Sequence, residues 1–269
     1  MVDTILVPGK TVPLIVFLVI VISMYLMMRY ASKGKVPTIR TLPAYNAITE
    51  AVGRAVEVGK PVHYTTGTYT FVGQTAGGSA ALTAGLSLLA YISDICLSKG
   101  ATLISSCAYP EVMTIESEIL RGSYLKAGME DEYSEVEHLR YVPIVSSCAP
   151  FAAGVAGWIE REKPATNFLL GPFFFESLVI AEAGYHAGCF QVAGTTSAGY
   201  SAFFLACCDY VLIGEELYAA AALATNDPIQ AGSLRGNDVN RVWIIALIVI
   251  GVVVTLLGMK TALMNLLSI

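Results

Sequence analysis

The chain has 269 residues, of which 55% are hydrophobic and only 14% are charged, whereas roughly 25% of an average soluble domain is charged. This composition excludes intrinsic disorder, a coiled coil and a small disulfide scaffold, and six cysteines in so long a chain do not indicate a disulfide framework. The net charge of −5 disfavours nucleic acid as a partner, because phosphate backbones attract basic surfaces.

Two apolar segments lie near the ends of the chain. Thr11–Met28 and Val242–Met259 each hold eighteen residues without a formal charge, close to the length that crosses a bilayer as a helix. The alternative, a buried core helix, usually has polar residues on one side. For the first segment a cleaved signal peptide is a second alternative, but no net positive charge precedes the segment and no small-residue cleavage site follows it. The sequence therefore predicts transmembrane helices at 11–29 and 242–260, with the lipid bilayer as a partner.

More basic residues flank the inner ends of these segments than their outer ends. Four lysines or arginines, ending with Arg40, follow the first segment, whereas Lys10 alone precedes it; two precede the second, whereas Lys260 alone follows it. Because flanking basic residues favour the cytoplasmic side, we expect the middle of the chain in the cytoplasm and both termini outside the plasma membrane. The predicted membrane-interface anchors are Tyr25, Arg29, Lys33, Lys35, Arg241 and Trp243.

The sequence predicts one folded domain between the two spans. Residues 1–10 are expected to form a short extracytoplasmic N-terminus, 30–44 and 235–241 juxtamembrane linkers, and 45–234 the cytoplasmic domain. The apolar tail 261–269 either extends the second span or lies in the membrane interface.

Short apolar runs alternate with helical patterns in this domain. The predicted strands are Val62–Thr65, Thr102–Ser106, Leu139–Ser146, Asn167–Leu170, Phe190–Ala193 and Tyr210–Ile213. The predicted helices are Asn46–Val58, Ser79–Leu97, Pro110–Ala127, Phe151–Glu162, Phe174–Ala187, Tyr200–Cys207 and Glu216–Ala224.

Such alternation favours βαβ units and a mainly parallel, doubly wound (Rossmann-like) α/β sheet. Nearly continuous apolar strands are typical of a sheet buried on both faces. The alternative is a protein that crosses the membrane many times, because Pro61–Ser93 and Ala183–Cys208 carry no Lys, Arg, Asp or Glu. Gly, Ser, Thr and Gln interrupt both stretches, which favours the α/β domain.

Four stretches resemble an uncharacterised prokaryotic membrane-protein family known only by a domain-of-unknown-function label. They are Glu50–Gly67, Ala152–Gly184, Cys208–Ala222 and Gly232–Asp238. The resemblance covers most of residues 43–240 and implies a membrane-anchored cytoplasmic domain. It implies no activity, substrate or catalytic residue.

Ligands of an open α/β sheet bind where strands end and helices begin, and here these turns are rich in hydroxyls, thiols and glycines. The sequence has no Walker loop, no G-x-G-x-x-G, no G-x-S-x-G elbow and no zinc-ligand spacing. We therefore predict no catalytic residue, metal or cofactor. The candidate ligand-binding residues are Ser106, Cys107, Ser147, Cys148, Thr195, Thr196, Ser197 and Glu215.

Each group of candidates has a purely structural alternative. Ser-Ser-Cys-Ala occurs at 105–108 and at 146–149, where a helix dipole could lower a thiol's pKa or small residues could simply pack in two similar turns. Hydroxyls at such turns also cap helices. Glutamates 176, 182, 215 and 216 could supply acid–base chemistry or complement helix dipoles.

Lysine and arginine are absent from Pro164 to Leu234, over 71 residues, where aromatic residues are frequent. An apolar surface of that extent normally marks a protein contact; the alternative is that these elements form the enclosed centre of the sheet. We expect a homo-oligomer whose interface contains Phe173, Phe174, Phe175, Tyr185, Tyr200, Phe203 and Tyr218.

Two functions are consistent with these features of the sequence. The first is a membrane-anchored cytoplasmic protein that self-associates into a structural or scaffold assembly. The alternative is a membrane-tethered enzyme or sensor that binds a small ligand (a nucleotide, an anion or a metal) through the strand-end turns. The missing catalytic motifs favour the first. An unidentified small ligand or partner protein is a further possible partner.

Overall fold

A computed structural model describes residues 11–34, 38–72, 75–144 and 146–256. These described residues divide into two units. One is residues 40–225, and the other combines the helices near the two ends of the chain. Lys10, Lys35, Lys260 and the tail 261–269, which the sequence-based predictions include, lie outside the described residues.

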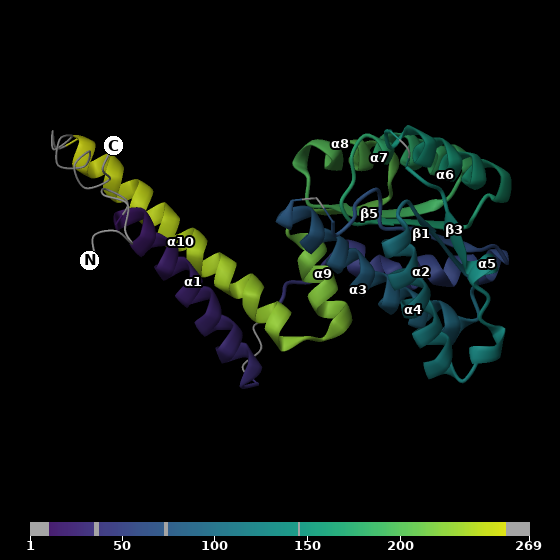
Figure 1. The fold of residues 1–269 in the computed structure, drawn as a ribbon, viewed down its shortest axis with the longest axis horizontal. Coiled ribbons are helices and arrows are strands. Elements are labelled where there is room, and N and C mark those ends of the chain that lie inside the picture. The colour runs from purple at the N-terminus through teal and green to yellow at the C-terminus, as the bar shows by residue number, and fades with distance from the viewer. Residues whose placement is uncertain (1–10, 35–37, 73–74, 145, 257–269) are drawn as a thin grey trace. The chain divides into compact units, whose positions relative to one another are not determined.

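The unit of residues 40–225 is built on six parallel strands (Figure 1). Their order is β3-β2-β1-β4-β5-β6, so the chain builds outward from β1 to one edge and from β4 to the other. The predicted parallel α/β sheet is therefore confirmed. The bounds are β1 (Val62–Thr65), β2 (Leu103–Cys107), β3 (Leu139–Tyr141), β4 (Thr166–Leu170), β5 (Phe190–Thr195) and β6 (Tyr210–Ile213).

Helices cover both faces of the sheet, which explains why its central strands are apolar (Figure 1). On one face lie α2 (Pro43–Val58), α3 (Ala76–Lys99), α4 (Pro110–Ala127) and α9 (Glu216–Thr225). On the other lie α6 (Ala149–Glu162), α7 (Glu176–Ala187) and α8 (Ala198–Cys207). The short helices η1 (Glu130–Glu132) and α5 (Glu135–His138) precede β3.

The helix α3 is a core helix despite its composition. In the described residues three helical stretches are long and apolar enough to cross a membrane: Pro13–Ser32, Ala76–Lys99 and Pro228–Val253. Within the second, 56% of the most apolar window is buried, against 6% and 11% in the other two. Its leucines pack on the sheet, so the apolar stretch beginning at Pro61 belongs to the α/β fold.

Strand β3 is shorter than the predicted Leu139–Ser146. It ends at Tyr141, and one more backbone hydrogen bond follows, from Val142 N to Cys107 O at 3.0 Å. Pro143 comes next and has no N–H to continue the ladder. Ser146 and Ser147 therefore lie in the loop before α6.

The predicted linker at 235–241 is instead helical, and the α/β unit ends at residue 225 rather than 234. Helix α10 (Pro228–Leu256) begins where Asp227 Oδ1 accepts a 2.8 Å hydrogen bond from the N–H of Ile229. Within this helix Arg235 pairs with Asp238 at 3.9 Å.

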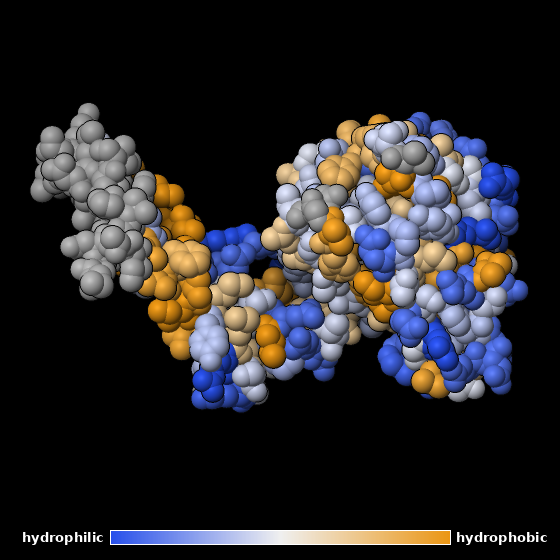
Figure 2. All heavy atoms as spheres, viewed as in Figure 1, coloured by the Kyte–Doolittle hydropathy of each residue, from blue (hydrophilic) through white to orange (hydrophobic). Residues whose placement is uncertain are grey.

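The second unit is an antiparallel pair made of α1 (Thr11–Ser32) and α10. The helices approach closely where α10 carries glycine: a Cβ on Gly232 would lie 2.7 Å from that of Ala31. Further along the pair, Ser23 donates a hydrogen bond to the side-chain oxygen of Asn240. Large apolar side chains lie on the outside of the pair, as the orange surface in Figure 2 shows.

Five of the six membrane-interface candidates lie within the described residues. Arg29 Nη1 lies 3.4 Å from the hydroxyl of Tyr25 on the next turn of α1. Lys33 and Trp243 are exposed, and Arg241 precedes Trp243 on α10.

Candidate functional site

The loop that follows β1 places a row of threonines at the carboxyl edge of the sheet. Thr66 Oγ1 donates to Glu116 Oε1 of α4 at 2.9 Å. Two residues further on, Thr68 donates to Glu176 at the start of α7, and after two more Thr70 donates to Glu111 of α4. Each hydroxyl thus faces a different carboxylate. From β1 the chain adds strands toward one side of the sheet, and from β4 it adds them toward the other side. The strand order therefore reverses between β1 and β4, and the carboxyl edge there is the topological switch point where open α/β sheets bind ligands.

Glu176 is the most unusual side chain at this edge. It is fully buried, and its Oε1 accepts hydrogen bonds from Thr68 and, at 2.9 Å, from the N–H of Phe174. Its second oxygen, Oε2, is also buried and has no partner within the described residues. A buried acceptor without a donor costs about 1–3 kcal/mol, so a native structure normally supplies one.

The thiol of Cys148 lies beside this carboxyl. Burial, followed by the charge of Glu176 and a hydrogen bond to it, raises the pKa of Cys148 to about 11. The thiol is therefore protonated at neutral pH and is a hydrogen-bond donor rather than a nucleophile. Glu116 has a related environment, since burial raises its pKa to about 7 although the hydroxyls of Ser105 and Thr66 oppose the shift.

The loops after β1 and β4 touch at the switch point. Gly67 has φ of +87°, and a Cβ there would lie 2.3 Å from the carbonyl oxygen of Pro172. The ring of Tyr69 stacks on Phe174 with centroids 5.0 Å apart, and Phe174 meets Tyr200 edge-on at 6.0 Å. These contacts fill the space between the two loops with glycine backbone and aromatic rings.

The candidates on β2 point into the fold. Ser106 is buried, and its Oγ lies 2.9 Å from Nε2 of His63. Cys107 is buried against the opposite face, and burial, with the charge of Glu116, raises the pKa of its thiol. Cys107 is therefore a core residue, as the structural alternative for the repeated Ser-Ser-Cys-Ala proposed. In the second copy, Ser147 is exposed and Cys148 immediately precedes α6.

The candidates after β5 and β6 lie together at the same carboxyl edge. Thr195 is buried at the end of β5, and its Oγ1 accepts a 3.4 Å hydrogen bond from the N–H of Ser197. Thr196 is half-buried and bonds the hydroxyl of Tyr218 on α9. Ser197 precedes α8 without capping it through its side chain, and Glu215 is half-buried just before α9.

A row of buried polar side chains crosses the middle of the sheet and was not predicted from the sequence. His63 of β1 lies with Nδ1 2.7 Å from Asn167 Oδ1 of β4, and Asn167 Nδ2 donates to Gln191 Oε1 of β5 at 2.8 Å. With Ser106 the row spans four adjacent strands on the face covered by α6 and α7. Polar residues at matching register positions of apolar strands were the available signal.

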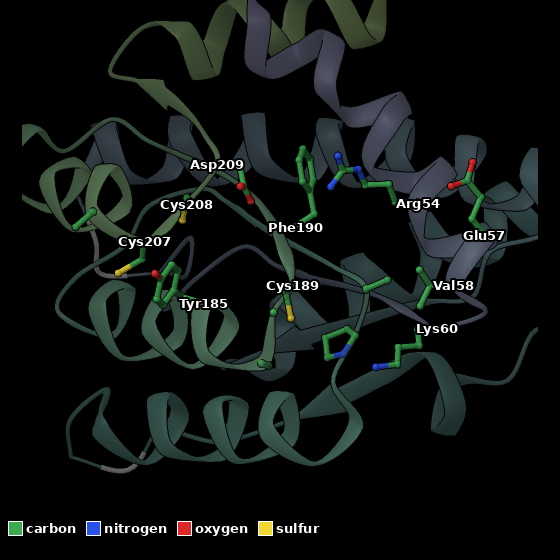
Figure 3. A pocket seen from close by; sticks show the side chains of 15 residues that line it. Arg54, Glu57, Val58, Lys60, Tyr185, Cys189, Phe190, Cys207, Cys208 and Asp209 are labelled. Carbon is green, nitrogen blue, oxygen red and sulfur yellow. The ribbon is translucent and has the colours of Figure 1, made fainter.

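A cavity with a volume of about 760 Å³ lies at the opposite edge of the sheet, where the strands begin. Figure 3 shows Tyr185, Cys207 and Cys208 at one end of it and Arg54, Glu57 and Lys60 at the other. Arg54 lies over the ring of Phe190, 4.6 Å from its centroid. Burial raises the pKa of the nearby Cys189 thiol to about 11. The mixed charges and protonated thiols indicate no particular chemistry.

Among the described residues, metal binding has no cluster of ligating side chains to support it. Across the part of the chain that the structure describes, no group of three or more His, Cys, Asp or Glu side chains could hold a metal ion. The threonine-bonded glutamates at the carboxyl edge each face a separate hydroxyl, so they do not form a shared ligand set.

A family model described as a domain of unknown function (DUF6754) matches residues 4–266. The chain belongs to this family. The match spans both apolar end helices as well as the sheet unit, so the DUF6754 pattern includes all of these parts. The resemblance to an uncharacterised family is thereby confirmed. No curated protein and no solved structure matches the chain.

Proposed function

We propose that this protein is anchored in the plasma membrane by α1 and α10 and holds a Rossmann-like domain on the cytoplasmic side, where the domains self-associate into a scaffold assembly. The anchoring is supported by the apolar outer surface of the helix pair, which water solvates poorly and lipid solvates well. The strand order β3-β2-β1-β4-β5-β6 is that of dinucleotide-binding sheets, which supports the Rossmann-like label.

The orientation is supported by the basic residues that flank the two helices on the domain side. Protease added to intact cells should leave the acidic segment at residues 130–137 uncut, whereas protease added to inside-out vesicles should cut it. Cleavage in intact cells would reverse the proposed topology.

The outer surface of α7 and α8 is the observation that carries self-association. From Phe175, which immediately precedes α7, exposed apolar side chains recur at Leu178, Val179 and Tyr185, a helical stripe that faces away from the sheet. The exposed Glu182–His186 pair lies on the same side of the helix. Tyr185 exposes 64% of its surface, and Leu205 on α8 exposes 59%. Hydrophobic residues gather over these helices at the top of the domain in Figure 2. Neither helix holds a lysine or arginine.

The predicted interface residues divide into three groups by their exposure. Phe175 and Tyr185 are exposed and belong to the stripe. Phe173 is only 2% exposed and packs edge-on against Phe204 at 5.2 Å, so it serves the core of its own chain. The remaining four are half-buried: Phe174, Tyr200, Phe203 and Tyr218.

Light scattering on the full-length protein in detergent tests the proposal. The wild type should form particles of several copies, and Leu178→Glu should shift them to single copies, because a carboxylate cannot be buried in an apolar contact without a partner. Leu125→Glu, at another exposed leucine on α4, is the matched control and should leave the size unchanged. A wild type that runs as a single copy would exclude the scaffold.

A small-ligand site at the switch point is the second candidate function. The buried carboxylate of Glu176 favours it: its Oε2 accepts no hydrogen bond of normal geometry from the described residues, with the Cys148 thiol as its neighbour, and a ligand donor would complete the carboxylate. A thermal-shift screen with amines, divalent ions and nucleotides should find a stabilising compound whose effect Glu176→Gln removes. Equal shifts in the wild type and the variant would exclude this site.

A further inference from the structure

A cavity of about 340 Å³ lies at the β3 edge of the sheet, against α6. Strand β3 contributes Arg140 and Tyr141, helix α6 contributes Trp158 and Arg161, and β2 contributes Ser106. The volume is at the lower end of the range of ligand pockets in proteins. None of the residues that line this cavity is an aspartate or glutamate.

Two hydrogen-bond donors at this cavity lack an acceptor. Four buried side-chain polar atoms of the described residues have no partner, and two of them are Arg140 Nε and Trp158 Nε1. Trp158 is only 5% exposed, so its indole N–H is withdrawn from bulk water. Buried donors in native proteins are almost always satisfied by protein, water or a ligand. Both unsatisfied donors belong to residues that line this one cavity, which favours a ligand that supplies hydrogen-bond acceptors.

The two arginines at the cavity form no ion pair with a carboxylate of the described residues. Arg140 lies over the indole of Trp158, 5.2 Å from the ring centroid. Across the described part of the chain, the ion pairs of arginine and lysine with carboxylates include neither Arg140 nor Arg161. A Cβ on Gly157 would lie 3.3 Å from Arg161 Nη1, so the guanidinium lies against a turn of α6 that has no side chain.

The buried polar row reaches this cavity and fixes the direction of its hydrogen bonds. Gln191 Nε2 donates to the carbonyl oxygens of Ala181 and Cys207, so its Oε1 accepts from Asn167. Asn167 Oδ1 must then accept from His63 Nδ1–H. His63 Nε2 is therefore unprotonated and accepts the proton of Ser106, 2.9 Å away.

The direction of these hydrogen bonds, together with the charge of His63, decides what the cavity can bind. Burial, with a smaller contribution from the charge of Arg140, lowers the pKa of His63 to about 4, so the imidazole is neutral and adds no charge. A base this weak is poorly suited to activate Ser106 for nucleophilic attack at neutral pH, although Ser106, His63 and Asn167 are placed like a catalytic triad. Ser106 gives its proton to His63 and so offers the cavity no donor, and the arginines and the tryptophan supply donors and positive charge.

We propose that this cavity is a binding site for a small oxyanion, a phosphate or carboxylate group of a metabolite, held by Arg140, Arg161 and the indole N–H of Trp158. Arginine presents a planar fork of donors that matches such groups. The Trp158 N–H adds a third donor from a different direction. The site is separate from the switch point and from the α7–α8 surface, so it stands or falls independently of both.

Titration of the full-length protein in detergent tests the site, with inorganic phosphate and malonate as separate probes and chloride holding the ionic strength constant. The Trp243→Phe variant leaves Trp158 as the only tryptophan, so its fluorescence reports occupancy. We expect a saturable change with phosphate, malonate or both, and the tighter probe identifies the preferred group. No saturable change with either probe would overturn the proposal.

Substitutions locate the binding. Arg140→Gln should weaken the affinity, measured by calorimetry, roughly tenfold or more, because a charged hydrogen bond is lost. Arg121→Gln is the control, since Arg121 is exposed and pairs with Glu130 at 3.0 Å. If Arg140→Gln fails to fold, Trp158→Phe keeps the ring and removes only the N–H, and it should also weaken binding. Wild-type affinity in the folded variants would place the anion elsewhere and refute the site.

Discussion

Ser105 Oγ donates a 2.7 Å hydrogen bond to Oε2 of Glu116, a carboxyl that has no exposure to solvent. The bond joins the middle of β2 to α4, and Thr66, which follows β1, donates to the other oxygen, Oε1. A carboxyl so enclosed favours its neutral form, because burial penalises the charge more than two hydroxyl donors stabilise it. Glu116 is therefore a source of pH-dependent stability.

Folding should bind a proton at Glu116 between pH 4.5 and pH 7. The folded pKa is raised from 4.5 to about 7, so the native state holds the proton that the unfolded state releases. This contribution is fully present below pH 4.5 and is lost as the pH rises to 7, a fall of about 3 kcal/mol in the free energy of unfolding. Glu116→Gln should remove this fall, as denaturant melts of the full-length protein at a series of pH values would show.

His63 acts in the opposite direction over almost the same range. Its pKa is lowered from 6.5 to about 4, so its contribution to stability grows as the pH rises from 4 to 6.5. The two effects partly cancel in the wild type. In Glu116→Gln the rise due to His63 should become visible, and a variant with the same pH profile as the wild type would contradict the raised pKa.

The carboxylate of Glu176 should control the reactivity of Cys148. Its charge and its hydrogen bond both raise the pKa of that thiol, so Glu176→Gln should lower the pKa and speed alkylation by iodoacetamide. A fall of one unit would increase the thiolate fraction about tenfold. Mass spectrometry of the labelled peptide measures the rate, and Cys207, on α8, is the internal reference. An unchanged rate at Cys148 would show that the two groups are not coupled.

Gly67→Ala should destabilise the sheet unit strongly. The new Cβ would meet the carbonyl oxygen of Pro172 at a backbone φ of +87°, which residues with a side chain rarely adopt. We expect a loss of about 2 kcal/mol or more in the free energy of unfolding. Gly122→Ala in α4 is the control, because nothing lies within 4 Å of its Cβ. It should instead gain about 0.5–1 kcal/mol. Equal effects of the two changes would refute the close approach at Gly67.

Gly232→Leu should separate α1 from α10, because its Cβ position lies 2.7 Å from Ala31 Cβ and 3.0 Å from Met27 O. Oversized groups in such contacts cost about 1–3 kcal/mol. Ser23 and Asn240 contact each other, so cysteines at these two positions should form a disulfide. When a protease cuts the chain at residues 130–137, this disulfide should keep the two fragments joined. Gly232→Leu should reduce the joined fraction, and Gly251→Leu, with no neighbour within 4 Å among the described residues, should not. A reduction with both would point to a general effect of bulk.

The sequence alone determined the secondary structure and the parallel α/β class. Helical and strand patterns are local, so the strands at Val62–Thr65 and Tyr210–Ile213 and the helix at Pro110–Ala127 have the predicted bounds. Composition also predicted apolar helices near both ends of the chain. Where a single residue overrides a pattern, the bounds differed: the apolar run after Leu139 suggested a strand to Ser146, but Pro143 ends its hydrogen bonding.

Only the tertiary structure decided which side chains meet. Helix α3 is apolar enough to cross a membrane, and its packing on the sheet, a long-range property, places it in the core. Ser106 and Asn167 are separated by 43 and 104 positions from His63, and the parallel register of β1 with β2 and β4 brings the three together. The cavity with Arg140 and Arg161 likewise depends on α6 lying against the edge strand β3. Contacts of this kind depend on strand order, which the one-dimensional pattern of apolar residues does not encode.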